Sequence, residues 1–185
     1  MAALDLFFAR GFEGTTLEAI AEALGYTKPA LYYYFESKEA LFRAIMLMSL
    51  REAAAQIEAI HSQDTTPRAK LRDVIRMYLD DHFTHRGYFS ISHLLTGSRG
   101  HILQGPGLGE IESLSRQIPG EIIDIISQGV AAGEFIAEDP EVLGSIVFAM
   151  LSGVLIHMNM PALAGAEQSK LRSSLDEIIV KGISA

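Results

Sequence analysis

Apolar residues recur at intervals of three and four along nearly the whole chain, as they do on one face of a helix. Leu71, Ile75, Tyr78 and Leu79 show this spacing within one segment. Nowhere is there a sustained run in which apolar and polar residues alternate with enrichment in β-branched side chains, which would indicate a strand. The pattern predicts an all-α fold of about nine helices.

Length and composition limit the class of protein. The 185 residues suffice for one domain, or for one small and one medium domain. Residues of the AVILMFWYC set make up 49% of the chain, enough for a core, which excludes disorder as the main state. The formal net charge of −8 argues against a general polycation on nucleic acid but still permits a small, local DNA-contacting surface. The sequence lacks cysteine, which excludes disulfides and thiolate metal sites and fits a reducing, cytoplasmic location.

Neither a signal peptide nor a membrane partner is expected. Asp5 precedes Arg10 in the first twelve residues, the reverse of the charge order in a secretory signal. Residues 142–166 carry no Asp, Glu, Lys or Arg, but several glycines and Pro161 interrupt them and no basic cluster flanks them. We therefore expect a buried bundle helix in this stretch.

Two short helices are predicted around a three-residue turn at residues 25–27. The segment Thr15–Glu18 has the S/T-x-x-E form of a capping box and opens a helix that runs through Leu24. Gly25 ends that helix, and Thr27 can cap the next one. This arrangement is typical of a helix-turn-helix.

The two helices are expected to have one inward and one outward face. The inward positions are Ala21, Leu24, Ala30, Leu31 and Phe35. The outward positions are Thr27, Lys28, Tyr32, Tyr33 and Tyr34. Hydroxyls and an ammonium beside small residues suit contacts with phosphates and base edges in a major groove. The alternative is ordinary helical packing, with at least one of the three tyrosines partly buried at a junction of two subdomains.

A longer pattern surrounds this hairpin. It reads Phe8-x-x-Gly11-Phe12-x-x-Thr15-Thr16-Leu17-x-x-Ile20-Ala21-x-x-Leu24-Gly25-Tyr26-Thr27-Lys28-Pro29-Ala30-Leu31-Tyr32-x-Tyr34-Phe35-x-Ser37-Lys38-Glu39-x-Leu41. The pattern closely resembles the DNA-binding domain of the TetR family of bacterial transcriptional regulators, of the TetR/AcrR type. The resemblance implies a helix-turn-helix DNA-binding domain at residues 1–45 and a helical ligand-binding and dimerisation domain at residues 46–185.

The resemblance also implies roles for individual residues. The residues at phosphate-contacting positions of the family are Thr15 or Thr16, Tyr32, Tyr34 and Lys38. The residues where the family reads bases are Thr27, Lys28 and Ala30, with Pro29 shaping the helix start and Tyr33 facing the groove. The family's core positions are filled by Phe8, Phe12, Ile20, Ala21, Leu24, Leu31, Phe35 and Leu41.

The first fifty residues carry little positive charge for a DNA-binding role. They contain four basic and six acidic residues, a net charge of −2. Only seven residues precede Phe8, so we expect no phosphate contacts from a basic arm of the kind that family members usually have. Because phosphate neutralisation sets the non-specific affinity and its salt dependence, we expect modest and strongly salt-sensitive DNA binding.

The larger helical domain is expected to enclose a pocket for a small hydrophobic or amphipathic effector. The candidate lining residues are Phe83, Phe89, His93, Leu94, Phe148, Met150, Leu151, His157 and Met158. Each of them could instead be an ordinary core residue.

The last two helices, at about residues 140–157 and 167–181, are the expected homodimer interface. Small residues that would permit close approach are Gly144, Ala149, Ser152 and Gly153, and apolar area would come from Leu171, Leu175 and Ile178. Two-fold symmetry would then place two recognition helices about 34–36 Å apart or slightly more. The alternative is that these faces pack only within one chain.

These features together predict a ligand-responsive transcriptional regulator, a repressor whose homodimer releases palindromic operator DNA on binding its effector. The alternative is a small-molecule sensor module with weak or lost DNA binding. No enzyme activity, cofactor or metal is expected. His82-x-x-His85 lacks further convergent ligands, the glycine-rich loop at residues 105–109 follows no strand, and no G-x-S-x-G motif occurs.

Overall fold

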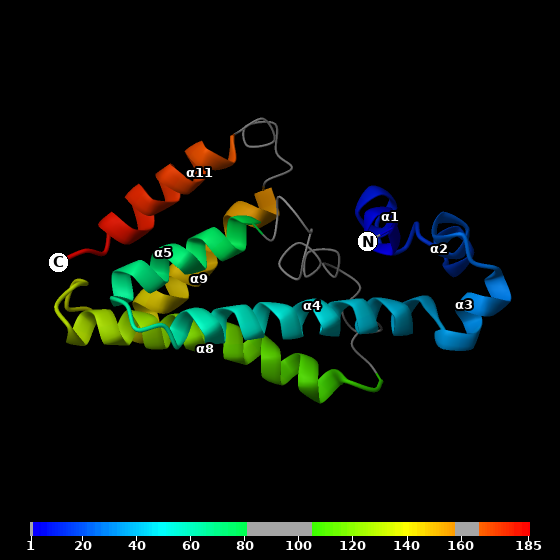
Figure 1. Ribbon diagram of the computed structural model, residues 1–185, viewed down its shortest axis with the longest axis horizontal. Helices are drawn as coiled ribbons and strands as arrows, with labels where there is room; N and C mark the ends of the chain where they lie inside the picture. Colours follow the sequence, from blue (N-terminus) through cyan, green and yellow to red (C-terminus); the bar gives the residue numbers. More distant parts are fainter. Residues whose placement is uncertain (1, 81–104, 158–166) are drawn as a thin grey trace.

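The computed structural model describes residues 2–80, 105–157 and 167–185. The elements in these ranges are α1 (Ala2–Arg10), α2 (Leu17–Leu24), α3 (Lys28–Tyr34), α4 (Lys38–His61), α5 (Pro67–Asp80), α8 (Leu108–Ala131), α9 (Pro140–His157), α11 (Gln168–Leu175) and the π-helix η2 (Asp176–Lys181) (Figure 1). Within the described ranges the only β pairing is an isolated bridge between Phe135 and Ser184. The predicted all-α fold is therefore confirmed.

Hydroxyl caps determine where the first helices begin. Three side-chain oxygens accept the backbone N–H three residues further on, and they belong to Thr16, Thr27 and Ser37. The expected capping box is wrong by one residue, because Thr16 and not Thr15 caps α2. Thr15 is fully buried, and its hydroxyl donates to the carbonyl oxygen of Gly11 at 2.7 Å, with that of Leu6 at 3.2 Å.

Helix α4 connects the two halves of the molecule (Figure 1). Near its start, the fully buried ring of Phe42 packs edge-on against Phe7 and Phe12, with centroid distances of 5.0 and 5.2 Å. This aromatic cluster fixes α1 and the loop after it to α4. Further along, α4 packs against α8, which in turn contacts α5 and α9.

The core positions expected among the first helices are largely confirmed as buried. The buried residues include Phe12, Ile20, Ala21, Leu31 and Leu41, and Phe35 packs against them. Leu24 does not belong to this core, because 38% of it is exposed. Leu24 is the last residue of α2, directly before the turn at Gly25, and the neighbouring described residues leave part of its side chain exposed. The side chain of Phe8 lies outside the described residues.

Several residues expected at the dimer interface pack within the chain instead. A Cβ on the buried Gly144 would lie 2.6 Å from Cγ1 of Ile123, so this glycine serves the contact between α9 and α8. Leu171 and Leu175 are also buried. Ile178, in contrast, is 59% exposed, since α11 continues as η2 and the buried positions there are Ile179 and Val180.

None of the helices in the described part of the chain is both long enough and apolar enough to span a membrane.

We predict that Phe42→Ala lowers the free energy of unfolding by about 3–5 kcal/mol, because it removes the centre of the aromatic cluster and leaves a cavity. Urea unfolding followed by far-UV circular dichroism measures the loss. Met48→Ala on the same helix is the control, since Met48 is 62% exposed and its truncation should change stability little. Equal effects of the two substitutions would contradict the assigned orientation of α4.

Candidate DNA interface

The hairpin of α2 and α3 lies at one end of the molecule, beyond the start of α4 (Figure 1). Gly25 ends α2 in the left-handed conformation, with φ of +71° and ψ of 20°. Its N–H donates to the carbonyl of Glu22, and the N–H of Tyr26 donates to that of Ala21 at 2.8 Å. Glycine adopts this conformation without the steric cost that a Cβ imposes. The sharp turn therefore follows directly from the residue at position 25.

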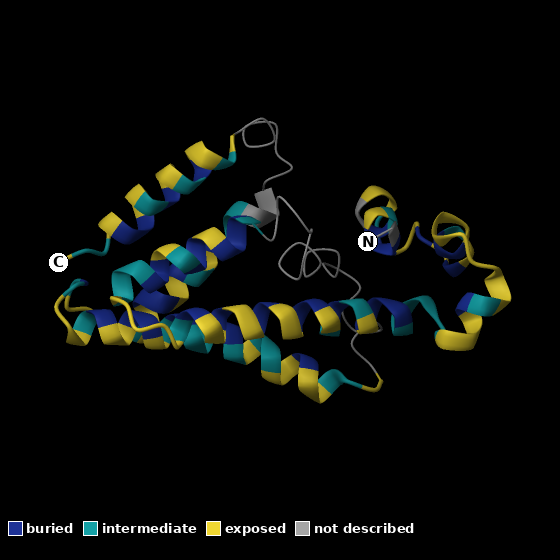
Figure 2. Ribbon diagram, viewed as in Figure 1, coloured by how far each residue is buried: buried dark blue, intermediate teal, exposed yellow. Residues whose placement is uncertain are grey.

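Helix α3 presents its tyrosines to solvent. Tyr33 is 84% exposed, Tyr34 is 74% exposed and Tyr32 is 42% exposed, whereas Leu31 is buried against the core. Figure 2 shows α3 mostly in the colour of exposed residues. None of the three is fully buried, and Tyr32 is the most covered of them. The rings of Tyr33 and Tyr34 contact each other edge to face at 5.2 Å.

A carboxylate from α2 holds two of the outward residues of α3. Oε1 of Glu18 lies 2.6 Å from Nζ of Lys28 and accepts a hydrogen bond from the Tyr32 hydroxyl at 3.2 Å. The Lys28 ammonium also lies 5.6 Å from the centre of the Tyr32 ring. The hydrogen bond from Lys28 lowers the pKa of Glu18 to about 2, and the same contact raises the pKa of Lys28.

Lys38, the first residue of α4, is held against the protein. Its side chain is 19% exposed, and Nζ donates to the carbonyl oxygen of Phe12 at 2.9 Å. The ammonium lies 4.4 Å from the centre of the Phe12 ring and 3.7 Å from a carboxylate oxygen of Glu13. In this conformation Lys38 fixes the loop after α1 to α4, and its contact with phosphate stays a prediction.

The remaining residues expected to contact DNA differ in how far they are buried. Thr15 is buried and donates its hydroxyl internally, so of the two threonines only Thr16 lies at the surface. Thr27 and Pro29 are exposed at the start of α3, and Ala30 is half-buried. Apart from Thr15, the structure brings the sequence-predicted residues of α2 and α3 to one exposed hairpin.

Glu18 is the residue that sequence reasoning missed at this surface. It was assigned only to the capping box of α2, although it carries the charge opposite to that of Lys28. The ten-residue separation gives no periodic signal, because the two side chains meet across the turn between helices. Only the angle between α2 and α3 brings them together.

The expected effector-lining residues are described only in part. Phe148 and Met150 are half-buried against the core, and Leu151 is buried. The other expected residues lie outside the described ranges or have no described side chain: Phe83, Phe89, His93, Leu94, His157 and Met158.

A second polar cluster joins the far end of α4 to α8. The Nδ1 atom of His61 lies 2.5 Å from a carboxylate oxygen of Glu121, and Nε2 lies 2.9 Å from Nε2 of Gln128. Asp124 offers a further oxygen within 4.8 Å of the other ligand atoms. Both ring nitrogens lie close to protein groups, Glu121 on one side and Gln128 on the other.

We predict that Lys28→Met raises the pKa of Glu18 from about 2 toward 4.5, since it removes the largest cause of the lowering. In the unaltered protein, the charged pair is fully formed above pH 4.5 and is lost as the pH falls through the lowered pKa. A titration of the Glu18 carboxyl carbon by NMR measures both values. Lys170→Met, on exposed α11, should leave the pKa of Glu18 unchanged. The same low pKa in both variants would show that another group is responsible.

Comparisons with known proteins agree with this architecture over most of the chain. The sequence profile of the bacterial regulatory proteins of the tetR family matches residues 1–45, and that of the tetracyclin repressor-like C-terminal domain matches residues 64–156. The transcriptional regulator RutR of Escherichia coli O157:H7 is 35% identical over 153 residues, which cover 80% of this chain and 68% of that protein. The match to RutR of strain K12 is 44% identical over 79 residues and spans 37% of that protein.

Solved structures show the same fold. The ketosteroid regulator KstR2 of Mycobacterium tuberculosis matches with a TM-score of 0.81 at 19% identity, covering 100% of this chain and 92% of that chain. AibR in complex with isovaleryl coenzyme A and operator DNA matches with a TM-score of 0.76 at 21% identity, covering 99% and 94%. Together with the exposed hairpin of α2 and α3 and the profile matches to both halves of the sequence, these likenesses show that the chain belongs to the tetR family of helix-turn-helix transcriptional regulators.

Proposed function

We propose that this protein is a ligand-responsive repressor whose homodimer binds a palindromic operator through α3 and releases it on binding a small hydrophobic effector. The observation that carries the proposal is the exposed face of α3, where three tyrosines and Lys28 follow the sharp turn at Gly25. Phenolic hydroxyls and an ammonium donate to phosphate oxygens and base-edge acceptors, and the short helix fits a major groove.

Exposed apolar residues on α9 and on η2 support the homodimer. Val142 and Ile146, one helical turn apart on α9, are 55% and 51% exposed, and Ile178 of η2 is 59% exposed. Ala149 is also exposed further along α9. Burying such side chains against a second copy stabilises a dimer through the hydrophobic effect. The last two helices thus remain the proposed interface, through their outward residues.

Helix α4 gives the effector domain a route to the hairpin. Both carboxylate oxygens of Glu110, in the first turn of α8, accept hydrogen bonds from the guanidinium of Arg51, at 2.6 and 2.8 Å. An effector that binds between the helices and moves α8 would therefore move α4 and change the separation of the two α3 helices. Such coupling requires that the effector bind the two states differently, typically by about 1–3 kcal/mol. AibR, which shares the fold, has been crystallised with an acyl coenzyme A and operator DNA.

One observation favours the second candidate, a sensor module with weak DNA binding. In the free protein the Glu18 carboxylate pairs with Lys28 and accepts a hydrogen bond from Tyr32. Its negative charge lies on the face that would approach phosphates. DNA must displace or tolerate this carboxylate, which lowers affinity. Binding to a duplex from the region upstream of the protein's own gene separates the two candidates.

We predict that Lys28→Gln weakens operator binding about 10- to 100-fold, the loss typical of one phosphate or base contact. Fluorescence anisotropy with a labelled duplex, repeated over a range of salt concentrations, measures the affinity and its salt slope. Glu18→Gln should act in the opposite direction, because it releases Lys28 and removes a negative charge. The matched control is Lys170→Gln on α11. No binding of any variant at low salt would refute the repressor and favour the sensor module.

We predict that Ile146→Glu converts the dimer to a monomer and abolishes cooperative binding to a palindromic duplex. A charge at position 146, between the exposed Val142 and Ala149 of α9, would be buried without a partner in the dimer. Sedimentation equilibrium measures the mass of each form. Ala59→Glu, at an exposed site on α4, is the control and should stay dimeric. A dimer that persists in Ile146→Glu would place the interface elsewhere.

A further inference from the structure

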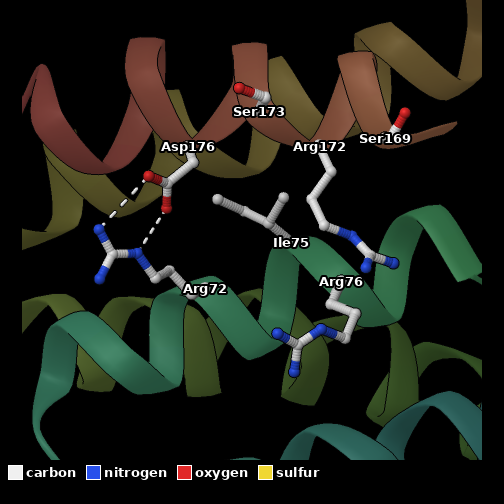
Figure 3. A pocket seen from close by; sticks show the side chains of 7 residues that line it. All are labelled: Arg72, Ile75, Arg76, Ser169, Arg172, Ser173 and Asp176. Atoms are coloured by element: carbon white, nitrogen blue, oxygen red, sulfur yellow. Dashed lines mark hydrogen bonds and ion pairs between the residues drawn. The ribbon is translucent and has the colours of Figure 1, made fainter. Parts of the chain in front are cut away.

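A cavity of about 360 Å³ lies between α5 and the helix formed by α11 and η2 (Figure 3). Its lining residues are Arg72, Ile75, Arg76, Ser169, Arg172, Ser173 and Asp176. The polar residues among these were not singled out by the sequence, and the cavity is separate from the hairpin and from the described effector-lining residues of α9.

Three arginines line the cavity, and each of them is paired with a carboxylate. Three guanidinium groups and one carboxylate line it, although the whole chain has 15 basic and 23 acidic residues. Figure 3 shows Arg172 descending from α11 toward α5, Arg72 extending from α5 to Asp176, and the side chain of Arg76 running downward from α5. The wall facing these charges includes the side chain of Ile75, which is buried.

Carboxylates fix the orientation of each arginine without using all of its donors. Asp176 accepts hydrogen bonds from Nε and Nη2 of Arg72 at 2.5 and 3.3 Å. Arg76 donates through Nη1 to Asp73 at 2.7 Å, and Arg172 donates through Nη2 to Asp80 at 2.9 Å. A guanidinium has five N–H donors, so each arginine keeps donors for a ligand.

One of the remaining donors is buried and unsatisfied. The Nε atom of Arg172 is inaccessible to solvent and has no hydrogen-bond partner among the described residues. Buried polar groups in proteins almost always have partners. Because solvent does not reach this atom, a ligand in the cavity would contact the terminal nitrogens of Arg172 instead. Ser169 and Ser173, one turn apart on α11, add hydroxyl donors to the same cavity.

We propose that this cavity binds a small molecule through a phosphate or diphosphate group, with Arg76 and Arg172 as its main ligands. Guanidinium groups from two helices approach from different directions, which suits a tetrahedral anion with several oxygens better than a planar carboxylate. The volume exceeds what one phosphate fills, which leaves room for the rest of the ligand. The site would act in addition to the proposed apolar effector pocket and does not depend on DNA binding.

Isothermal titration of the full chain with pyrophosphate tests the proposal, with inorganic phosphate and succinate as separate arms at equal ionic strength. We expect saturable binding of pyrophosphate, weaker binding of phosphate and none of succinate. Arg76→Gln should weaken pyrophosphate binding at least tenfold. Its side chain is 54% exposed and its carboxylate partner is on its own helix, so the variant should fold.

Two further variants make the result decisive. Arg51→Gln removes an equally exposed arginine that pairs with Glu110 outside the cavity, and it should bind pyrophosphate like the unaltered protein. Ser173→Asp keeps all three arginines but adds a negative charge to the cavity wall, and it should abolish binding. Circular dichroism confirms that each variant is folded. Equal affinity of Arg76→Gln and Arg51→Gln, or succinate binding as tight as that of pyrophosphate, would overturn the proposal.

Discussion

The burial of one continuous stripe along α4 is the interaction on which the rest of the structure depends. The stripe begins with Leu41 and Phe42, which belong to the core of the first domain, and ends with Ile57 and Ile60 beside α8. Neither half of the molecule could change its position on α4 without exposing large apolar side chains to water. Because the helix is unbroken from Lys38 to His61, the two halves are joined by a rod and not by a flexible linker.

The fold could be predicted from the sequence where local signals act. Gly25 and the caps Thr27 and Ser37 specify helix ends through backbone conformation and a single hydrogen bond, and both operate within a few residues. Thr15 shows the limit of such signals. Two adjacent threonines both satisfy the capping pattern, and only the packing of α1 and its following loop against the start of α2 decides which one is buried.

The candidate sites show the same division between local and long-range information. The outward face of α3 could be predicted from periodicity, because one buried residue, Leu31, fixes which way the other side chains point. The contact between Glu18 and Lys28 depends on the crossing of two helices, and the arginine cavity depends on α11 packing over α5. The sequence could not show whether Leu171 and Leu175 pack inside the chain or against a second copy, since both arrangements bury apolar side chains.

The polar cluster of His61, Glu121 and Gln128 has a mechanical consequence for α4. It ties the last turn of that helix to the middle of α8, whereas the first turn carries the hairpin. A helix of 24 residues is about 35 Å long at a rise of about 1.5 Å per residue, so it acts as a lever with a fixed far end. Tilting such a lever by about 5° displaces its free end by about 3 Å, given a rise of about 1.5 Å per residue. Small adjustments between α4 and α8 are therefore magnified at the hairpin by distance alone.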